Sequence, residues 1–502
     1  MLRRRKLLAA SNVIVRRTFA ASAIACMVCS ASGLSAQRLD YAVAGKPVTP
    51  APVDPQIAAA LAKISPQQLR ATDAKLVSFK QRVTIGSMET DLPPGTGILA
   101  AADWIESQFK AYSDACGGCL EVKRDEFIEP AQQGSAARIT QPTKLVNVYA
   151  VLHGTDPAQT SRRVLVTGHY DSRSSDTLND HADAPGANDD ASGVAVSLEC
   201  ARVLSKLKLP STIVFVAVAG EEQGLIGSRH LAKLAKSEGW DLAAVLNNDI
   251  VGGDTTPGDM LFDKRAVRVF SEGIPATATL DEMQRITSLG AESDSASREL
   301  ARAIADVSRT YLKAPKSVDP FHPALIFRHD RYLRGGDHTS FNQEGFTAVR
   351  ITDWRENYTH QHNTPRTENG IEYGDFMKYV DFNYVANVTR MNLASLAVLA
   401  SAPGAPEKVG VLTQALDNNS ELVWIAPKGA PPGTRYEVVW RLTTEPDWTY
   451  CAPLTTATRL KLPVSKDNVI FGVRSVDAAG HRSPAVSAMP STDAIFHAPP
   501  SK

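Results

Sequence analysis

The chain has 502 residues, which is too long for one ordinary hydrophobic core and predicts two to four folded units at about 150 residues each. Hydrophobic residues make up 43% and charged residues 22%, as in ordinary soluble globular proteins. The 54 basic and 54 acidic side chains cancel, so the composition argues against a nucleic-acid-binding protein, which would carry a basic patch.

The N-terminus has the pattern of an export signal. A basic start is followed by an apolar, small-residue stretch at 20–34, and cleavage after Ala36 would leave Gln37 as the first mature residue. The stretch is too short, and too rich in Ala and Ser, to span a membrane. We expect residues 1–36 to be a signal peptide and the mature protein to be periplasmic or secreted. The weaker alternatives are a twin-arginine signal at Arg16-Arg17 and a lipoprotein signal at Cys26 or Cys29.

Residues 37–56 are rich in Pro and Ala, and we expect them to be extended and loosely held. Beyond them, helical and strand patterns alternate. Helices are predicted at 57–82, 98–112, 191–207 and 226–237, and strands at 145–152, 164–167, 212–219, 243–247 and 346–351. The first two strands suggest a hairpin or neighbouring strands. The alternation predicts an α/β domain at 57–402, with a mostly parallel central sheet covered by helices on both faces.

The composition changes near residue 402, where a Pro/Ala/Gly linker ends the helical patterns. Short strands are predicted at 409–415, 421–425, 436–442, 459–463 and 469–476, so residues 403–495 should form a small antiparallel β-sandwich. The order of Trp424, Tyr436–Trp440 and Phe471–Gly480 resembles a fibronectin type III domain. That resemblance implies that Trp424 and Trp440 pack in the sandwich core, and the domain would be a spacer or a substrate- or wall-binding appendage.

Four cysteines follow the leader. Cys116 and Cys119 are close enough to bridge in an oxidising compartment, and a structural disulfide is favoured over a redox pair or a zinc knuckle. Cys200 lies in an apolar helical pattern and should be part of the core, whereas Cys451 could be free.

Polar side chains follow three of the predicted strands. His169 comes directly after the strand at 164–167, Glu221 and Glu222 follow the strand at 212–219, and Asp249 follows the strand at 243–247. A Gly-flanked loop, 186–193, carries two more acidic residues before a helix. Ligands of open α/β sheets bind beyond the carboxyl ends of the strands, so these side chains should converge.

Taken singly, each side chain has a structural interpretation. Asp189 and Asp190 could cap the next helix, and Glu221 and Glu222 could favour a helix N-terminus. Capping does not require imidazole and carboxylate groups on successive strand ends, however. Together these groups match the nitrogen and oxygen ligands of catalytic zinc, and two zinc ions that share a carboxylate can promote hydrolysis of an amide.

These segments resemble the di-zinc aminopeptidase family, whose relatives include glutamate carboxypeptidases and glutaminyl cyclases, over about residues 70–400. The resemblance implies two Zn²⁺ ions per chain and peptide substrates. It makes Glu221 the general base, which activates a metal-bound water, and it makes Asp171 the residue that orients a histidine ligand. The implied metal ligands are His169, Asp189, Glu222, Asp249 and a late histidine, for which His362 fits better than His360.

Three further residues match less specific parts of the family pattern. Asp337 could orient the site, and His338 could bind substrate or only fill a turn. Tyr358 could donate a hydrogen bond to a developing oxyanion, or it could simply pack. Removal of an N-terminal residue is the favoured activity, with carboxypeptidase or dipeptidase activity at the same metals as the alternative. A cyclase is less favoured, and a non-catalytic binding or adhesion protein on this scaffold is the alternative from another class.

Overall fold

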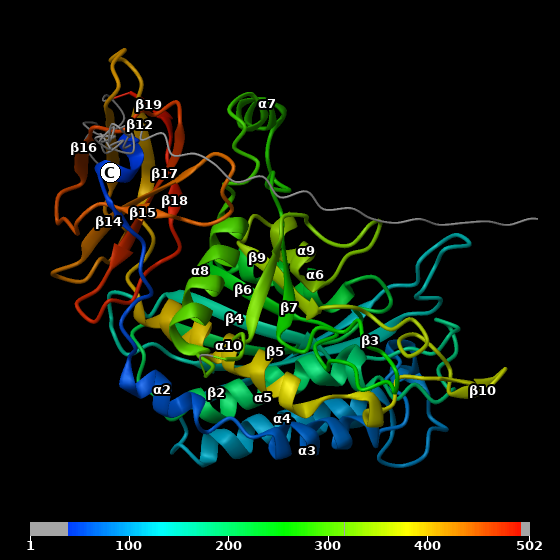
Figure 1. The fold of residues 1–502 in the computed structure, drawn as a ribbon. Coiled ribbons are helices and arrows are strands. Elements are labelled where there is room, and N and C mark those ends of the chain that lie inside the picture. Colours follow the sequence, from blue (N-terminus) through cyan, green and yellow to red (C-terminus); the bar gives the residue numbers. More distant parts are fainter. Residues whose placement is uncertain (1–38, 316, 493–502) are drawn as a thin grey trace, which may run out of the picture. The chain divides into compact units, whose positions relative to one another are not determined.

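An eight-stranded mixed sheet forms the centre of the larger domain in the computed structural model, which describes residues 39–315 and 317–492 (Figure 1). The predicted signal peptide, 1–36, lies outside these residues. The strands are β2 (Leu120–Glu129), β3 (Thr143–Leu152), β4 (Arg162–His169), β5 (Thr212–Val218), β6 (Asp241–Asn248), β7 (Ala266–Ser271), β8 (His322–Ile326) and β9 (Ala348–Asp353). Their order is β2-β3-β5-β4-β6-β9-β7-β8, and the central run from β5 to β9 is parallel. The predicted mostly parallel sheet is confirmed.

Helices cover both faces of this sheet (Figure 1). They are α2 (Pro55–Leu61), α3 (Pro66–Val77), α4 (Gly97–Asp114), α5 (Ser192–Leu204), α6 (Ile226–Ser237), α8 (Ala296–Tyr311), α9 (Asp337–Gln343) and α10 (Phe382–Ser401). Helix α7 (Leu280–Ser288) stands apart from the sheet and has no buried residue (Figure 1). Successive side chains of a strand point to opposite faces. In β5, Phe215 therefore joins the core beneath α3, α4, α5 and α10, while Val216 joins the core with α6 and α9. This explains why β5 is apolar without interruption.

Two expectations about the first half of the domain are wrong. β3 and β4 form neither a hairpin nor a neighbouring pair, because β5 lies between them, antiparallel to β3 and parallel to β4. The helix expected over 57–82 is two helices, α2 and α3, separated by a turn, because Ser65 caps a new helix whose first residue is Pro66. The patterns also gave no indication of β2, β7, β8, α8 or α10.

The C-terminal region consists of two small β-sheets, as the sequence predicts. One contains β16 (Arg459–Leu462), β13 (Ser420–Ile425), β12 (Glu407–Leu412) and β19 (Met489–Ser491), and the other contains β15 (Tyr450–Cys451), β14 (Arg435–Leu442), β17 (Val469–Val476) and β18 (Val486–Ser487). Their pairing is antiparallel except for β12 with β19. Trp424 and Trp440 are buried in the core between the sheets. The likeness to a fibronectin type III domain stays a prediction.

The segment 37–56 is not loosely held over its described part, contrary to expectation. It forms a short helix, α1 (Asp40–Val43), and a strand, β1 (Lys46–Pro47), which pairs with β15 at the edge of the second C-terminal sheet. The indole Nε1 of Trp440 donates a hydrogen bond to the carbonyl of Tyr41 at 2.9 Å. A Cβ on Gly45 would lie 2.2 Å from the Trp440 ring, so only glycine allows this approach. The segment thus belongs structurally to the C-terminal sheets.

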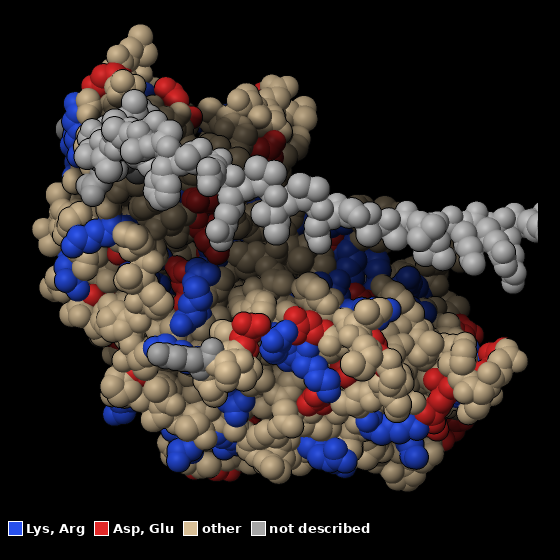
Figure 2. All heavy atoms as spheres, viewed as in Figure 1, with Lys and Arg blue, Asp and Glu red and all other residues tan. Residues whose placement is uncertain are grey.

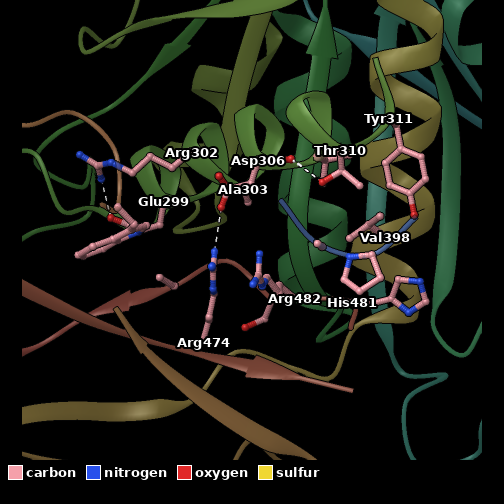
Figure 3. A pocket seen from close by; sticks show the side chains of 16 residues that line it. Glu299, Arg302, Ala303, Asp306, Thr310, Tyr311, Val398, Arg474, His481 and Arg482 are labelled. Atoms are coloured by element: carbon pink, nitrogen blue, oxygen red, sulfur yellow. Dashed lines mark hydrogen bonds and ion pairs between the residues drawn. The ribbon is translucent and has the colours of Figure 1, made fainter. Parts of the chain in front are cut away.

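Buried charges join helix α8 to the C-terminal sheets (Figure 3). The Arg474 guanidinium, on β17, binds Asp306 of α8 at 2.8 Å and Glu437 of β14 at 2.6 Å. Nearby, the indole of Trp448 donates to Glu299 of α8 at 2.8 Å. The C-terminal region therefore packs on the α/β domain through specific, desolvated polar contacts.

We expect Arg474→Met to lower the free energy of unfolding by about 3 kcal/mol, because it removes the buried cation that joins the two carboxylates. Asp306 would keep its contact with Arg309, and Glu437 would keep its contact with Arg482. Urea denaturation of the full chain measures this. Lys461→Met on β16 is the matched control, because the Lys461 side chain is 56% exposed and its loss should cost less than about 0.5 kcal/mol. Equal stability of the two variants would contradict the assignment.

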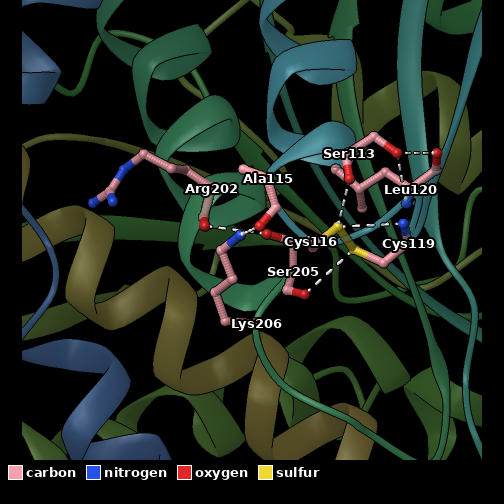
Figure 4. The surroundings of a disulfide bond; sticks show 8 residues. All are labelled: Ser113, Ala115, Cys116, Cys119, Leu120, Arg202, Ser205 and Lys206. Atoms are coloured by element: carbon pink, nitrogen blue, oxygen red, sulfur yellow. Dashed lines mark hydrogen bonds between the residues drawn. A yellow bond between two sulfur atoms is a disulfide. The ribbon is translucent and has the colours of Figure 1, made fainter.

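The predicted disulfide is present between Cys116 and Cys119, at the end of α4 (Figure 4). Cys200 is buried and Cys451 is a half-buried free thiol, as expected. On the face seen in Figure 2, acidic and basic side chains are intermingled, in keeping with the zero net charge. In the part of the chain that the structure describes, no helix is long and apolar enough to cross a membrane.

Candidate metal centre

The carboxyl ends of three adjacent parallel strands bring the predicted residues together. His169 is the last residue of β4, Glu221 and Glu222 lie three and four residues after the end of β5, and Asp249 follows β6 directly. Asp189 comes from the turn η2 (Ala187–Ala191), which precedes α5. Because β5, β4 and β6 are neighbours in register, these side chains meet at one edge of the sheet.

Asp189 lies between two histidines. Its Oδ1 is 3.2 Å from Nε2 of His169, and its Oδ2 is 3.0 Å from Nε2 of His362. Asp249 Oδ1 lies 3.9 Å from the same nitrogen of His169, and Glu222 Oε2 lies 3.2 Å from Nε2 of His362. The donors thus form two groups, one around each histidine, with a carboxylate oxygen of Asp189 directed to each. Such an arrangement can hold two cations that share a carboxylate.

His362, rather than His360, belongs to this cluster. His360 stacks on Tyr379 with ring centroids 4.0 Å apart, and its Nε2 lies 3.4 Å from the Thr256 hydroxyl. His362 has a φ of 58°, a backbone conformation that residues other than glycine rarely adopt. Three more non-glycine residues around the same cavity, Leu225, Ile250 and Leu333, also have positive φ values. Backbone strain of this kind gathers at functional sites.

Asp171 positions groups on both sides of the cluster. The Nδ1 atom of His169 lies 3.1 Å from the carbonyl oxygen of Asp171 and 3.4 Å from its carboxylate. The same carboxylate accepts hydrogen bonds from the backbone N–H groups of Glu221 and Glu222, at 3.3 and 3.1 Å. It therefore holds the imidazole and the Glu221–Glu222 turn in one arrangement. The role that the family resemblance implies for Asp171, orienting a metal-bound histidine, stays a prediction.

The donor set fits divalent metal ions. Asp189, Glu222 and Asp249 are buried, and Oε1 of Glu222 has no hydrogen-bond partner among the described residues. Burial raises the pKa of Glu221 well above its usual value, and the neighbouring carboxylates of Asp249 and Glu222 add to this. Buried carboxylates crowded around two imidazoles require cations to balance them. Imidazole nitrogen and carboxylate oxygen are ligands of zinc.

The charges within the cluster also raise the pKa values of the two histidines. Burial lowers the pKa of His362, but Glu222 and Asp189 outweigh it and raise that pKa to about 10. Burial also lowers the pKa of His169, but Asp171, Asp189 and Asp249 outweigh it and raise that pKa. Without metal the imidazoles thus hold protons, which metal ions would displace.

Asp190 and Asp375 support the loop that carries Asp189. The Asp190 carboxylate accepts from three backbone N–H groups, those of His169 at 3.0 Å, Gly193 at 2.9 Å and Ile250 at 3.2 Å. The Asp375 carboxylate accepts from the N–H of Asp189 at 2.7 Å and from that of the preceding residue. The peptide bond between Asp189 and Asp190 is cis. Asp190 thus does more than cap a helix. The sequence did not indicate Asp375, because it lies 186 residues from Asp189 along the chain.

Arg350 was also missed, although a signal for it exists. It interrupts the otherwise apolar start of β9, and its Nη2 contacts Asp249 at 2.8 Å. Burial raises the pKa of Asp249, but Arg350 and His169 outweigh it and lower that pKa. A single arginine inside a buried strand indicates that an anionic partner lies nearby, because a charged side chain is rarely buried unpaired.

The less specific candidates lie in three different settings. Asp337 is buried, and burial raises its pKa to about 7. His338 is buried, its Nε2 lies 3.0 Å from the carbonyl of His329, and burial lowers its pKa to about 4. Of the three, only Tyr358 lines the cavity beside the cluster, and its side chain is exposed. Substrate contact by His338 therefore finds no support in this geometry.

The cavity has a volume of about 530 Å³ and contains Asp189, Glu221, Glu222, Asp249 and His362 in its wall. Its size suits a small ligand or the end of a peptide. The fold and the donor set together define an α/β protein with a candidate binuclear metal centre at the strand ends.

Comparison with known proteins agrees with this class. Residues 147–369 match the model of peptidase family M28. The chain is 42% identical over 450 residues to a "Probable zinc metalloprotease" of Pyrenophora teres f. teres, covering 89% of each chain. It is 44% identical over 444 residues to one of Pyricularia oryzae, covering 87% of this chain and 85% of the relative. The chain therefore belongs to peptidase family M28.

Solved structures with related folds include the aminopeptidase LapA of Legionella pneumophila and a glutaminyl cyclase of Porphyromonas gingivalis. LapA is 20% identical, with a TM-score of 0.46, over 70% of this chain and 76% of its own. The cyclase is 17% identical, with a TM-score of 0.41, over 66% of this chain and 98% of its own.

Proposed function

We propose that the chain is an exported exopeptidase that holds two zinc ions and removes the N-terminal residue of peptides. The observation that carries the proposal is that Asp189 directs one carboxylate oxygen to each of two histidines, 3.2 and 3.0 Å away. In this proposal His169 and Asp249 would hold one ion, His362 and Glu222 would hold the other, and Asp189 would supply a carboxylate oxygen to each. The names of the relatives support zinc as the metal.

Zinc ions bound there would polarise the scissile carbonyl and make an attacking water more acidic. Glu221 lines the cavity beside His169 and Asp249, and we assign it the role of general base. It takes the proton from the attacking water and then delivers it to the nitrogen of the leaving amine. Asp171 keeps this carboxylate directed at the cavity by binding the N–H groups of its turn. We assign Tyr358 the role of a hydrogen-bond donor to the oxygen that becomes negative.

Metal content and a substrate panel test the proposal. The purified chain should contain two zinc ions and hydrolyse aminoacyl 4-nitroanilides with a free amine, and N-acetylation of the same compounds should abolish cleavage. Chelation should remove activity, and added zinc should restore it. Cleavage of acetylated peptides from the carboxyl end would show a carboxypeptidase instead. Absence of bound metal would favour the binding-protein alternative.

N-terminal sequencing of exported protein, with Gln37 expected first, tests export.

A further inference from the structure

Arginine side chains dominate the part of the cavity that lies outside the metal-ligand cluster. Among the described residues, the acidic side chains in its wall are Asp189, Glu221, Glu222 and Asp249, all of them in the cluster. The wall also contains five arginines, which are Arg138, Arg173, Arg331, Arg334 and Arg350. Two divalent cations would neutralise the four carboxylates. The remaining wall of the loaded site would then carry more positive than negative charge, since Asp330 and Glu356 are the carboxylates that pair with these arginines.

Two of these arginines are committed to the protein itself, and a third, Arg138, donates to the carbonyl of Glu222 at 2.8 Å. Arg350 binds Asp249 at 2.8 Å and is buried. Arg331 has an acceptor for each of its three nitrogens, in Asp330, Glu356 and the carbonyl of Gly335. Arg350 uses both Nη atoms, on Asp249 and on the Gly335 carbonyl, and Arg331 uses all three nitrogens, so their role is to hold the wall together.

Arg173 and Arg334 have donors to spare. The Nε of Arg173 lies 3.3 Å from the Ser174 carbonyl and 3.9 Å from the Glu222 carboxylate, and neither Nη atom has a hydrogen-bond partner among the described residues. Arg334 donates to Glu356 at 2.7 Å through Nη1 alone. The two side chains are 17% and 31% exposed. Both guanidinium groups are thus partly desolvated, fixed by one contact, and open to the cavity.

Their positions flank the proposed reaction centre. Arg173 lies beside Glu222, in the group of donors around His362. Arg334 shares Glu356 with two other arginines, Arg268 and Arg331, so that single carboxylate faces three guanidinium groups. Asp330 is the other carboxylate at these arginines, and a further anion at this wall would relieve the remaining excess of positive charge. Arginine presents paired donors that match a carboxylate, and a partly dry setting strengthens such contacts.

We propose that the preferred substrates carry a carboxylate close to the scissile bond, and that Arg173 and Arg334 bind it as specificity-determining residues. The inference rests on the proposed peptidase function and adds the substrate class. Two sources present the same chemistry: the side chain of an N-terminal Asp or Glu, or the free carboxylate of a dipeptide.

Two substrate pairs that differ only in this charge test the inference. Glu- and Gln-4-nitroanilide report on an acidic side chain, and Leu-Leu and Leu-Leu-amide report on a terminal carboxylate. We expect the charged member of at least one pair to have a kcat/KM about 10- to 100-fold higher, mainly through a lower KM. The pair that discriminates identifies the source. Calorimetric binding of the same compounds to the Glu221→Gln variant should show the same preference in Kd.

Variants separate specificity from general damage. Arg173→Met and Arg334→Met should each reduce the preference about tenfold or more, while activity on the uncharged member stays within about threefold. Arg265→Met is the matched control, because this exposed arginine of the same type lies outside the cavity wall and should leave the preference intact. Equal hydrolysis within both pairs, or a preference that survives both variants, would overturn the inference while leaving the peptidase function standing. Failure to cleave any free-amine substrate would instead count against the proposed function.

Discussion

Glu221→Gln should lower kcat by about 10²- to 10⁴-fold without loss of zinc, because an amide of the same shape cannot accept the proton of the attacking water. The backbone N–H of residue 221 would keep its contact with the Asp171 carboxylate, so the turn should retain its position. Turnover of a free-amine 4-nitroanilide gives the rate, and atomic absorption gives the metal content. KM should change little, since the base acts only on the way to the transition state.

The neighbouring glutamate is the natural control. Glu222→Gln changes the same chemical group one residue along the chain, but Glu222 Oε2 lies 3.2 Å from Nε2 of His362. This variant should therefore lose zinc as well as activity. Glu221 also lies close to His169 and Asp249, so it could itself be a ligand. If Glu221→Gln loses as much zinc as Glu222→Gln does, Glu221 is a ligand and another group must be the base.

The candidate site was predictable where local pattern and strand position coincide. His169, Glu221 and Asp249 each follow an apolar run, and polar groups directly after parallel strands must gather at one sheet edge. The sequence distinguishes His362 from His360 less well, because the two histidines are only two residues apart in the same segment. The structure separates them by direction, since the His360 ring stacks on Tyr379 and turns away from the cluster.

Other features depend on contacts between distant parts of the chain. The insertion of β5 between β3 and β4 is a choice of partner that no alternation of apolar residues encodes. Asp375 binds the loop of Asp189 from 186 residues away, and nothing in its local sequence marks that task. In the same way, the pairing of β1 with β15 fixes a Pro/Ala-rich segment that looks unstructured by composition. Local periodicity finds the elements, but tertiary contacts decide their neighbours.

Neighbouring aspartates Asp189 and Asp190 should respond differently to the same substitution. Asp189→Asn replaces one carboxylate oxygen by an amide NH2 group, which cannot ligate metal, so we expect loss of at least one zinc per chain and a kcat/KM reduced by about 10²-fold or more. In the metal-free state this substitution weakens the contacts of Asp189 with the two imidazoles, but no backbone N–H depends on its carboxylate. We therefore expect it to cost less stability than the loss of the Asp190 carboxylate.

Asp190→Asn should instead act on stability. Its carboxylate accepts three backbone hydrogen bonds that tie β4, α5 and the end of β6 together, and an amide group would set N–H against N–H at one of them. We expect a loss of about 2–4 kcal/mol in the free energy of unfolding of the metal-free chain. Urea denaturation in the presence of chelator measures it beside Asp189→Asn. Asp189→Asn could instead prove the less stable of the two variants and keep both zinc ions. In that case Asp189 would be the structural residue and Asp190 the metal ligand.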